Sequence, residues 1–155
     1  MSDYVWRLGT SFELPLAPDE RVDRQTLQAI AQRYFNSLST HIAVPDDFHA
    51  RCNRYHSGTQ VTNVARNGVE GGGAKTCVAA IEGNLPWGPA VEQRFPIIDE
   101  ERGVVMGITL LRYPVLPGVP NMYVSEVFKI VRGKILTIDN IGIMSPHVAT
   151  IGFVH

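Results

Sequence analysis

Two long hairpins in the C-terminal half of the chain constrain the fold more than any other feature. The segments "VEQRFPIID" and "GVVMGITLLRY" flank the charged turn "EER", and "NMYVSEVFKIV" and "KILTIDNIGIM" flank the tight turn "RG". Gly133, in the second turn, can adopt the positive φ that such turns need. The pattern predicts long antiparallel strands, and such a sheet must cover at least one face with another layer.

An amphipathic helix before the strands supplies that layer. Its apolar residues follow the i, i+3, i+4 spacing of one helical stripe, and they are Leu27, Ile30, Ala31, Tyr34, Phe35 and Leu38. Asp23 can cap the helix, and Pro45 disfavours a helical conformation at Val44, so the sequence "VPDD" ends this unit. We therefore expect an α+β fold in which a curved antiparallel sheet wraps against N-terminal helices. It forms a single domain over residues 1–155, with an arm at residues 1–20.

Shorter elements connect the helix to the hairpins. Residues 48–62 are predicted to form a strand weakened by Gly58, and "KTCVAAIEG" a short helix closed by Gly83. The Pro-rich loop "NLPWGPA" displays Trp87. The glycine-rich stretch "NGVEGGGAKT" lacks the GK[ST] ending of a phosphate-binding loop, so we interpret it as a flexible connection or lid.

Composition argues against several classes of protein. The 155-residue chain has a net charge of −1 and no basic run, which argues against a nucleic-acid surface. Its longest apolar run is far shorter than the roughly 20 residues of a membrane helix, and "MSDYVWRLGT" does not resemble a secretory signal. Cys52 and Cys77 could pair only if the fold brought them together, and we expect two buried free thiols. The sequence thus predicts a soluble cytoplasmic protein. It shows no metal-ligand spacing and no cofactor fingerprint, so an enzyme of this sequence would work with side chains alone.

One carboxylate falls on the apolar face of a predicted strand. In "MYVSEVFKI", Val124, Phe128 and Ile130 share a face with Glu126. Burying an unpaired carboxylate is costly, so Glu126 needs a partner. The pattern is equally compatible with a structural ion pair, with a bulge that exchanges the two faces, and with a functional site.

The strand at "RCNRYHSGTQ" carries an unusual density of polar groups. Alternation places Cys52, Arg54 and His56 on one face, and Arg51, Asn53 and Tyr55 on the other. If Cys52 points inward, Arg54 is the natural counter-ion for Glu126, and His56 becomes an internal acid or base near neutral pH. The alternative is an ordinary hydrogen-bonded histidine.

Several other residues are weaker candidates. Asp99 is the hairpin acid closest to the apolar strand, and Arg94 alternates with Phe95 near either a pocket mouth or solvent. Aromatic side chains could line a pocket, although core packing is their usual role; they are Trp87, Tyr113 and Tyr123. One of Asp139 and Asn140 is expected to face inward.

Three segments resemble one superfamily. The sequences "CNRYHSGTQVTN", "RFPIIDEERGVVMGI" and "SEVFKIVRGKILTID" are similar to a subgroup of the nuclear-transport-factor-2-like (SnoaL-like) superfamily. Its pattern is C-x-R-x-E-N-G-x-Q-x-T-N, then R-x-P-x-x-D-E-E-R-G-x-V and E-x-F-K-I-x-x-G-x-I. The matching positions are Cys52, Arg54, Gly58, Gln60, Asn63, Arg94, Asp99, Arg102, Gly103, Glu126 and Lys129. The sequence departs from the pattern at His56 and Ser57, where the pattern has Glu and Asn, and this favours His56 as an adapted functional residue.

The resemblance implies a cone-shaped fold whose interior carries out cofactor-independent reactions on hydrophobic, often aromatic molecules. In size and cofactor independence the chain is similar to bacterial lyases that remove formaldehyde from lignin-derived diarylpropane diols to give stilbenes. We therefore expect a lyase that acts on a small aromatic diol and releases formaldehyde and water. The alternatives are a dehydratase or isomerase of secondary metabolism, and a non-catalytic domain that binds an aromatic ligand or docks a partner.

The lyase hypothesis gives each candidate a role. His56 is the acid or base, Glu126 orients it or holds a substrate hydroxyl, and Arg54 keeps Glu126 ionised. Tyr55 and Asp99 complete the expected catalytic set. The expected substrate contacts are Trp87, Arg94, Phe95, Ile108, Tyr123, Phe128 and Asn140. Because an open sheet leaves one face to be covered, we also expect a homo-oligomer, either a dimer or a trimer.

Overall fold

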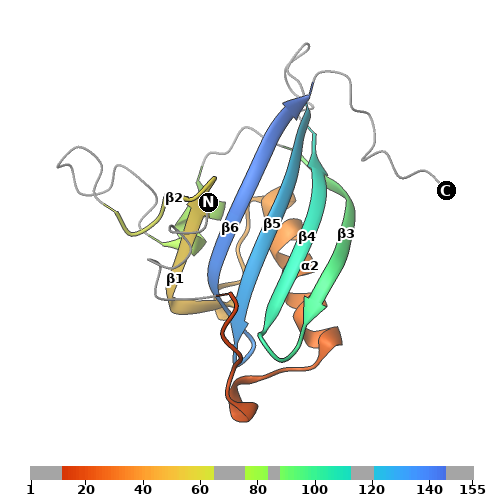
Figure 1. The fold of residues 1–155 in the computed structure, drawn as a ribbon. Coiled ribbons are helices and arrows are strands. Elements are labelled where there is room, and N and C mark those ends of the chain that lie inside the picture. Colours follow the sequence, from red (N-terminus) through yellow and green to blue (C-terminus); the bar gives the residue numbers. More distant parts are fainter. Residues whose placement is uncertain (1–11, 65–75, 84–87, 113–120, 146–155) are drawn as a thin grey trace.

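The computed structural model of the chain describes residues 12–64, 76–83, 88–112 and 121–145. Figure 1 shows the order of the elements along the chain. The helical elements are η1 (Pro18–Glu20), α2 (Arg24–Thr40), η2 (Pro45–Asp47) and α3 (Cys77–Glu82). The strands are β1 (Phe48–His56), β2 (Thr59–Gln60), β3 (Ala90–Asp99), β4 (Val104–Leu111), β5 (Asn121–Val131) and β6 (Lys134–Ser145). Trp87 and Tyr113 lie outside the described residues.

The long helix α2 forms as its sequence predicts. Asp23 caps it, because the Asp23 carboxylate accepts the backbone N–H of Thr26 at 2.7 Å. All six residues of the apolar stripe are buried. The helix ends earlier than the "VPDD" sequence suggests, because His41 adopts a left-handed conformation (φ 57°) and its N–H bonds the carbonyl of Ser37.

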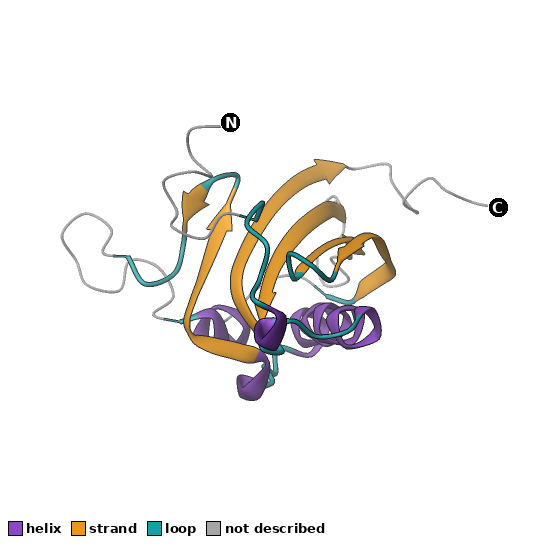
Figure 2. Ribbon diagram, turned by 60° about the horizontal axis from the view of Figure 1, so that its bottom comes forward, coloured by secondary structure: helices purple, strands orange, loops and turns teal. Residues whose placement is uncertain are grey.

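The six strands form one sheet in the order β2-β1-β6-β5-β4-β3. Figure 2 shows the sheet curving around α2, which lies against its concave side. This confirms the α+β architecture with a curved sheet wrapped on the N-terminal helix. The sheet is mixed and not wholly antiparallel, since β1 runs parallel to β6. The chain enters the sheet beside its last strand, and that pairing joins segments too far apart in sequence for a hairpin signal.

The register of the strands defines an inner face toward α2 and an outer face away from it. Glu126 lies opposite Gly107 on β4 and Asn140 on β6, all on the inner face. Gly107 leaves room for the helix, because a Cβ atom there would stand 2.6 Å from the Phe35 ring. The inner face and α2 together bury the hydrophobic core.

The outer face carries apolar side chains that remain exposed. Ile97, Ile141 and Ile143 are 52%, 49% and 63% exposed, respectively. Exposed apolar side chains on one face of a sheet are compatible with self-association, so the homo-oligomer stays a prediction. No helix within the described ranges is both long and apolar enough to span a bilayer.

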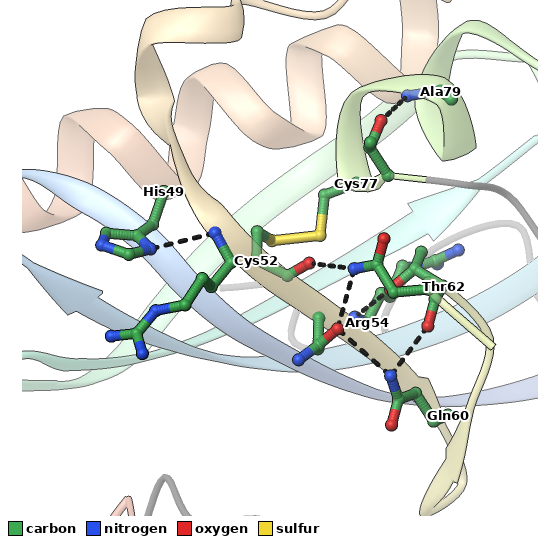
Figure 3. Close-up of a disulfide and its surroundings, with 11 residues drawn as sticks. His49, Cys52, Arg54, Gln60, Thr62, Cys77 and Ala79 are labelled. Carbon is green, nitrogen blue, oxygen red and sulfur yellow. Dashed lines mark hydrogen bonds between the residues drawn. A yellow bond between two sulfur atoms is a disulfide. The ribbon is translucent and has the colours of Figure 1, made fainter.

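The two cysteines form a disulfide, so the expectation of two free thiols is wrong. Figure 3 shows the Cys52–Cys77 bond linking the inner side of β1 to the first turn of α3, with Cα atoms 6.0 Å apart. Both cysteines are buried because α3 packs on β1. Thr76 caps α3 by accepting the Ala79 N–H at 3.0 Å. Stable disulfides are typical of oxidising compartments. The cytoplasmic location therefore stays a prediction, and this bond argues against it.

Candidate functional site

A buried carboxylate stands at the centre of the inner face. The Glu126 side chain is 1% exposed, and its neighbours Val124 and Phe128 on the same face of β5 are also buried. The strand alternation that predicted this orientation is confirmed, because no bulge intervenes between residues 121 and 129. A carboxylate in such surroundings is stable only when other groups compensate its charge.

Two side chains from different strands hold one oxygen of Glu126. Arg54 Nη2 lies 3.4 Å from Glu126 Oε1, and Asn140 Nδ2 donates to the same oxygen at 3.2 Å. The predicted Arg54–Glu126 ion pair is therefore confirmed, and so is the inward orientation of Asn140. The second oxygen, Oε2, has no hydrogen-bond partner among the described residues.

Tyr34 of α2 brings a phenol to the same place. Its ring packs edge-on against Phe128 with centroids 5.1 Å apart. Its hydroxyl is close enough to Arg54 and Glu126 to interact with both, but it makes no well-formed hydrogen bond within the described part of the chain. Burial raises the pKa of the Tyr34 phenol well above its ordinary value; Arg54 opposes the rise and Glu126 adds to it. Tyr34 thus stays protonated and can act as a hydrogen-bond donor.

Arg54 supplies a permanent positive charge. Burial lowers the pKa of its guanidinium, but Tyr34 and Glu126 more than offset this, and the pKa is raised overall. The backbone N–H of Arg54 donates to Thr62 Oγ1 at 2.8 Å, which fixes this part of β1 (Figure 3). A guanidinium does not exchange protons at ordinary pH, so Arg54 compensates charge and orients groups.

We call Tyr34, Arg54, Glu126 and Asn140 the inner polar cluster. Four of its atoms have no hydrogen-bond partner among the residues described here: Tyr34 Oη, Arg54 Nε, Glu126 Oε2 and Asn140 Oδ1. Buried polar atoms are normally paired, so four unpaired atoms in one cluster require an explanation. The cluster can accept a proton at Glu126, donate hydrogen bonds from Tyr34, and bind a polar group of a ligand.

His56 does not share the buried environment of Glu126. Its backbone is registered with Asn140, so it lies in the predicted row of the inner face, but its side chain is exposed. The expectation that imidazole and carboxylate are enclosed together is wrong. The physical reason is position: His56 ends β1 at the turn to the two-residue β2, close to the edge of the sheet. Burial raises the pKa of the neighbouring Asp139, whereas the Gly58 N–H and His56 lower it.

Four expected site residues occupy the outer face, and they are Tyr55, Arg94, Ile108 and Tyr123. Tyr123 lies opposite Ile143, and Arg94 lies opposite Ile108. Each of these pairs lies one cross-strand row away from a row of the inner face. Successive rows point to opposite faces, so these side chains cannot contact the Glu126 carboxylate from the inner side. Tyr55 is registered with Asp139 on the outer face and its hydroxyl lies 3.4 Å from Gln60 Oε1. These residues therefore do not line the inner side of the sheet beside Glu126, and their roles in a site stay predictions.

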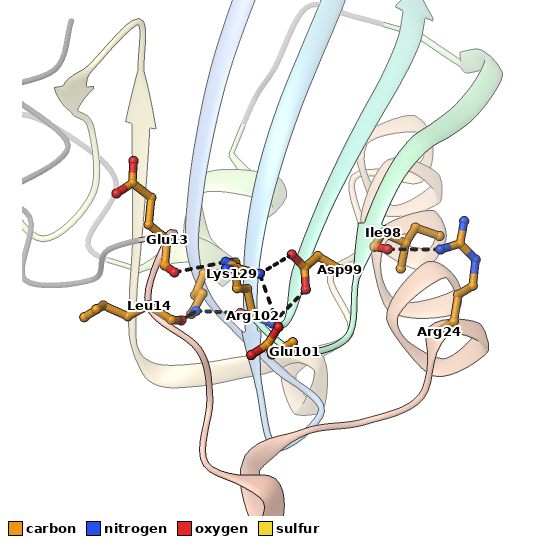
Figure 4. Close-up of polar contacts among 8 residues, drawn as sticks. All are labelled: Glu13, Leu14, Arg24, Ile98, Asp99, Glu101, Arg102 and Lys129. Atoms are coloured by element: carbon orange, nitrogen blue, oxygen red, sulfur yellow. Dashed lines mark hydrogen bonds and ion pairs between the residues drawn. The ribbon is translucent and has the colours of Figure 1, made fainter.

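Asp99 belongs to a turn. Its Oδ1 accepts the backbone N–H of Arg102, and its Oδ2 pairs with Arg102 Nη1, both at 3.0 Å (Figure 4). The Arg102 backbone N–H lowers the pKa of Asp99, burial opposes this, and the Arg102 side chain lowers it further. Asp99 stabilises the β3–β4 hairpin and lies apart from Glu126, so its place in a catalytic set stays a prediction.

The remaining candidates divide between the core and the undescribed part of the chain. Phe128 is fully buried on the inner face, and Phe95 stacks on Phe35 with centroids 5.9 Å apart. Trp87 lies outside the described residues. Sequence reasoning placed Tyr34 only in the helical core stripe. The available signal was a tyrosine within that stripe, since a buried phenol needs a partner for its hydroxyl.

The described residues include no group of three His, Cys, Asp or Glu side chains arranged to hold a metal ion. The inner polar cluster contains one carboxylate, one guanidinium, one amide and one phenol. This donor set suits hydrogen bonding and proton transfer better than metal binding.

A family model matches residues 20–142, most of the chain and all of the inner polar cluster. The chain belongs to the family described as a domain of unknown function, DUF8021. No curated protein matches it. The family assignment therefore names a group of related domains without naming a reaction.

Solved structures share the fold at low sequence identity. A protein from Sphaerobacter thermophilus is 11% identical with a TM-score of 0.52, covering 75% of this chain and 94% of its own. AclR from Streptomyces galilaeus, a proposed hydroxylase, is 13% identical with a TM-score of 0.54, covering 80% and 83%. An NTF-2-like protein from Burkholderia xenovorans is 12% identical with a TM-score of 0.48, covering 84% and 94%. The two structures with TM-scores above 0.5 show that this chain shares its α+β fold with both proteins.

Proposed function

We propose that the protein is a cofactor-independent enzyme, a lyase or dehydratase, that acts on a small hydroxylated aromatic molecule bound at the inner polar cluster. The observation that carries this proposal is that Glu126 Oε2 and Tyr34 Oη, which lie close enough for the two side chains to interact, make no well-formed hydrogen bond with any described residue. One is a proton acceptor and the other a hydrogen-bond donor, and both are buried among apolar and aromatic side chains. Water-poor surroundings strengthen both interactions.

The arrangement suits general base catalysis by Glu126. Its Oε1 is held by Arg54 and Asn140, so the carboxylate has a fixed orientation and Oε2 is left to accept a substrate proton. Tyr34 can donate a hydrogen bond to a departing or developing oxygen. Each such group typically contributes about 10²–10⁴ in rate.

The narrower proposal is the deformylating lyase that the resemblance suggests. A benzylic hydroxyl first takes up a proton and leaves as water, with Tyr34 hydrogen-bonded to the leaving oxygen, while the substrate's para-phenol gives up its proton and supplies the electrons. This gives a quinone methide. Glu126 then takes the proton of the terminal hydroxyl, the adjacent C–C bond breaks and formaldehyde leaves. The bonding electrons restore the aromatic ring as a phenolate, which takes the proton back from Glu126. Proton transfer in this scheme falls to Glu126, since His56 is exposed.

A second candidate function is non-catalytic binding of an aromatic ligand. It is favoured by the exposure of His56, which leaves Glu126 without a second acid or base beside it in the described part of the cluster. The same unpartnered atoms would then bind a hydroxyl or carbonyl of the ligand without transforming it. Turnover distinguishes the two functions.

The test measures turnover of lignin-derived aromatic diols by Glu126→Gln, Tyr34→Phe and His56→Ala. We expect Glu126→Gln to lose about 10²–10⁴ in kcat/KM and Tyr34→Phe a smaller factor. His56→Ala is the control and retains activity within a few-fold. Both test variants keep the shape of the native side chain, so circular dichroism should show an unchanged fold.

The products decide between the narrower alternatives. Formaldehyde in a one-to-one ratio with a stilbene supports the lyase, whereas a dehydrated product without a one-carbon fragment supports a dehydratase. Full activity of Glu126→Gln would contradict the proposed mechanism. Binding without turnover across the panel would favour the ligand-binding domain.

A further inference from the structure

A second concave site lies on the outer side of the sheet, away from the inner polar cluster. The pocket has a volume of about 540 Å³ and is bounded by the arm at residues 14–16, the start of β1 and the β5–β6 hairpin end. Lys129 marks its floor and faces outward, since it lies opposite Val104 and Thr137, one row away from Glu126. Pockets of roughly 300–1,000 Å³ hold small molecules.

Positive charge is concentrated in this pocket. Four of the lining side chains are cationic, and they are Arg51, Lys129, Arg132 and Lys134, against the single carboxylate of Glu20. The whole chain has a net charge of −1, so this excess is local. Arg132 pairs with Asp19 at 2.8 Å and with Glu20 at 3.7 Å, which neutralises the one acidic lining residue.

Lys129 is a buried ammonium group with neutral partners. The residue is 4% exposed, and its Nζ donates to the carbonyl oxygens of Leu14 at 2.9 Å and Arg102 at 2.5 Å (Figure 4). An ammonium group has three N–H donors, and two of them have acceptors among the described residues. Burial lowers the pKa of the Lys129 ammonium group, and the carboxylates of Asp99 and Glu20 oppose this, although neither of these described residues forms a salt bridge with it. A buried charge of this kind is stabilised by an anion.

Arg51 and His49 of β1 supply two further donors at the wall of the pocket. The Arg51 guanidinium forms no hydrogen bond or ion pair with the described side chains and carbonyls. The ring nitrogen Nδ1 of His49 accepts the Arg51 backbone N–H at 3.1 Å. This bond places the proton of the neutral imidazole on Nε2, which leaves Nε2–H as a donor.

We propose that this pocket binds a small amphipathic organic anion, a carboxylate attached to an apolar or aromatic body. The Arg51 guanidinium would bind the carboxylate, and Lys129 would add a buried positive charge beneath it. Leu14, Leu16 and Leu136 supply apolar walls for the body of the ligand. This site goes beyond the proposed function, since it lies on the opposite face of the sheet from Glu126.

The test is calorimetric titration of the full chain with 2-naphthoate, with neutral 2-naphthylmethanol as the matched ligand without the charge. Naphthoate should bind at least about tenfold more tightly than the alcohol, the effect of one charge-assisted contact. Arg51→Gln should weaken naphthoate binding by about tenfold or more and leave the alcohol unchanged. Arg51 is exposed, so this variant should fold.

Three controls localise the binding. Arg112→Gln removes an exposed arginine outside the pocket and should leave naphthoate affinity unchanged. Glu126→Gln should also leave it unchanged, because the cluster lies on the other face. Lys129→Met should weaken naphthoate binding in the same direction as Arg51→Gln.

Four outcomes would overturn the proposal. One is equal affinity for the acid and the alcohol, and another is unchanged naphthoate binding by Arg51→Gln. The third is the absence of naphthoate binding up to about 10 mM. A loss of binding in Glu126→Gln alone would place the ligand at the inner polar cluster and would equally contradict an outer site.

Discussion

Two acid–arginine pairs in this molecule have the same chemistry and opposite settings. At the β3–β4 hairpin, both oxygens of Asp99 are bound by Arg102, and the two side chains are 31% and 39% exposed. On the inner face, Arg54 and Asn140 bind one oxygen of Glu126, which is 1% exposed, while the other has no partner in the described chain.

The difference separates a pair whose hydrogen bonds are satisfied from a buried pair whose hydrogen bonds are incomplete among the described residues. In a surface pair that closes a turn, the two side chains satisfy each other's hydrogen bonds and solvent satisfies the rest, so no further partner is needed. A buried pair with unpaired atoms is costly, and a structural role alone would favour a saturated pair or an apolar replacement. The unsaturated cluster is therefore the place where a ligand can supply the missing hydrogen bonds.

The largest expected effect is the loss of one partner from each pair. Arg54→Met should lower the free energy of unfolding by about 3–5 kcal/mol, because it leaves Glu126 buried and uncompensated. Arg102→Met should cost about 1 kcal/mol or less, because Asp99 remains in contact with solvent. Urea denaturation of both variants measures the two losses.

A double variant provides the control for this comparison. Arg54→Met with Glu126→Leu removes both charges, and we expect it to recover most of the stability lost in Arg54→Met. Equal losses in Arg54→Met and Arg102→Met would show that the buried pair is no more demanding than the exposed one.

The disulfide provides a further test of the comparison between the buried and the exposed pair. Cys52 lies two residues before Arg54 of the buried pair, and far in sequence from the exposed pair at the β3–β4 hairpin. Replacing both cysteines by alanine should lower the free energy of unfolding by about 3–4 kcal/mol, the chain-entropy value for a closed loop of this length. Amide exchange should accelerate in β1 and α3 before it accelerates at the β3–β4 turn. Uniform acceleration would show that the bond does not act locally.

The smallest expected effect is a pH dependence at the exposed pair. The Arg102 backbone N–H lowers the pKa of folded Asp99, so its contribution to stability is present above the unfolded value of about 3.9. That contribution is lost as the pH falls through the lower folded pKa. Asp99→Asn should be slightly less stable than wild type near pH 7, and the difference should vanish in strong acid. Thermal unfolding of both proteins between pH 7 and strong acid measures this difference. A stability difference that persists in strong acid would contradict the role of the Asp99 carboxylate in the hairpin.

Local patterns in the sequence determined which residues face each other along the inner side of the sheet. Alternation in β5 placed Glu126 with Phe128, alternation in β1 placed Arg54 on the same side as Cys52, and the helical stripe placed Tyr34 in the core. These predictions succeed because side-chain direction within a strand or helix follows from the backbone repeat alone.

Exposure and long-range pairing were decided by the tertiary structure. His56 occupies the predicted row, yet it is exposed because β1 ends close to the sheet edge. Alternation along β5 already assigns Tyr123 to the face opposite Glu126, whereas the face of Arg94 depends on how β3 pairs with β4. Cys52 meets Cys77, 25 residues further along the chain, because a short helix packs on β1. Sequence periodicity carries no information about such distances, since they depend on how separate elements pack against one another.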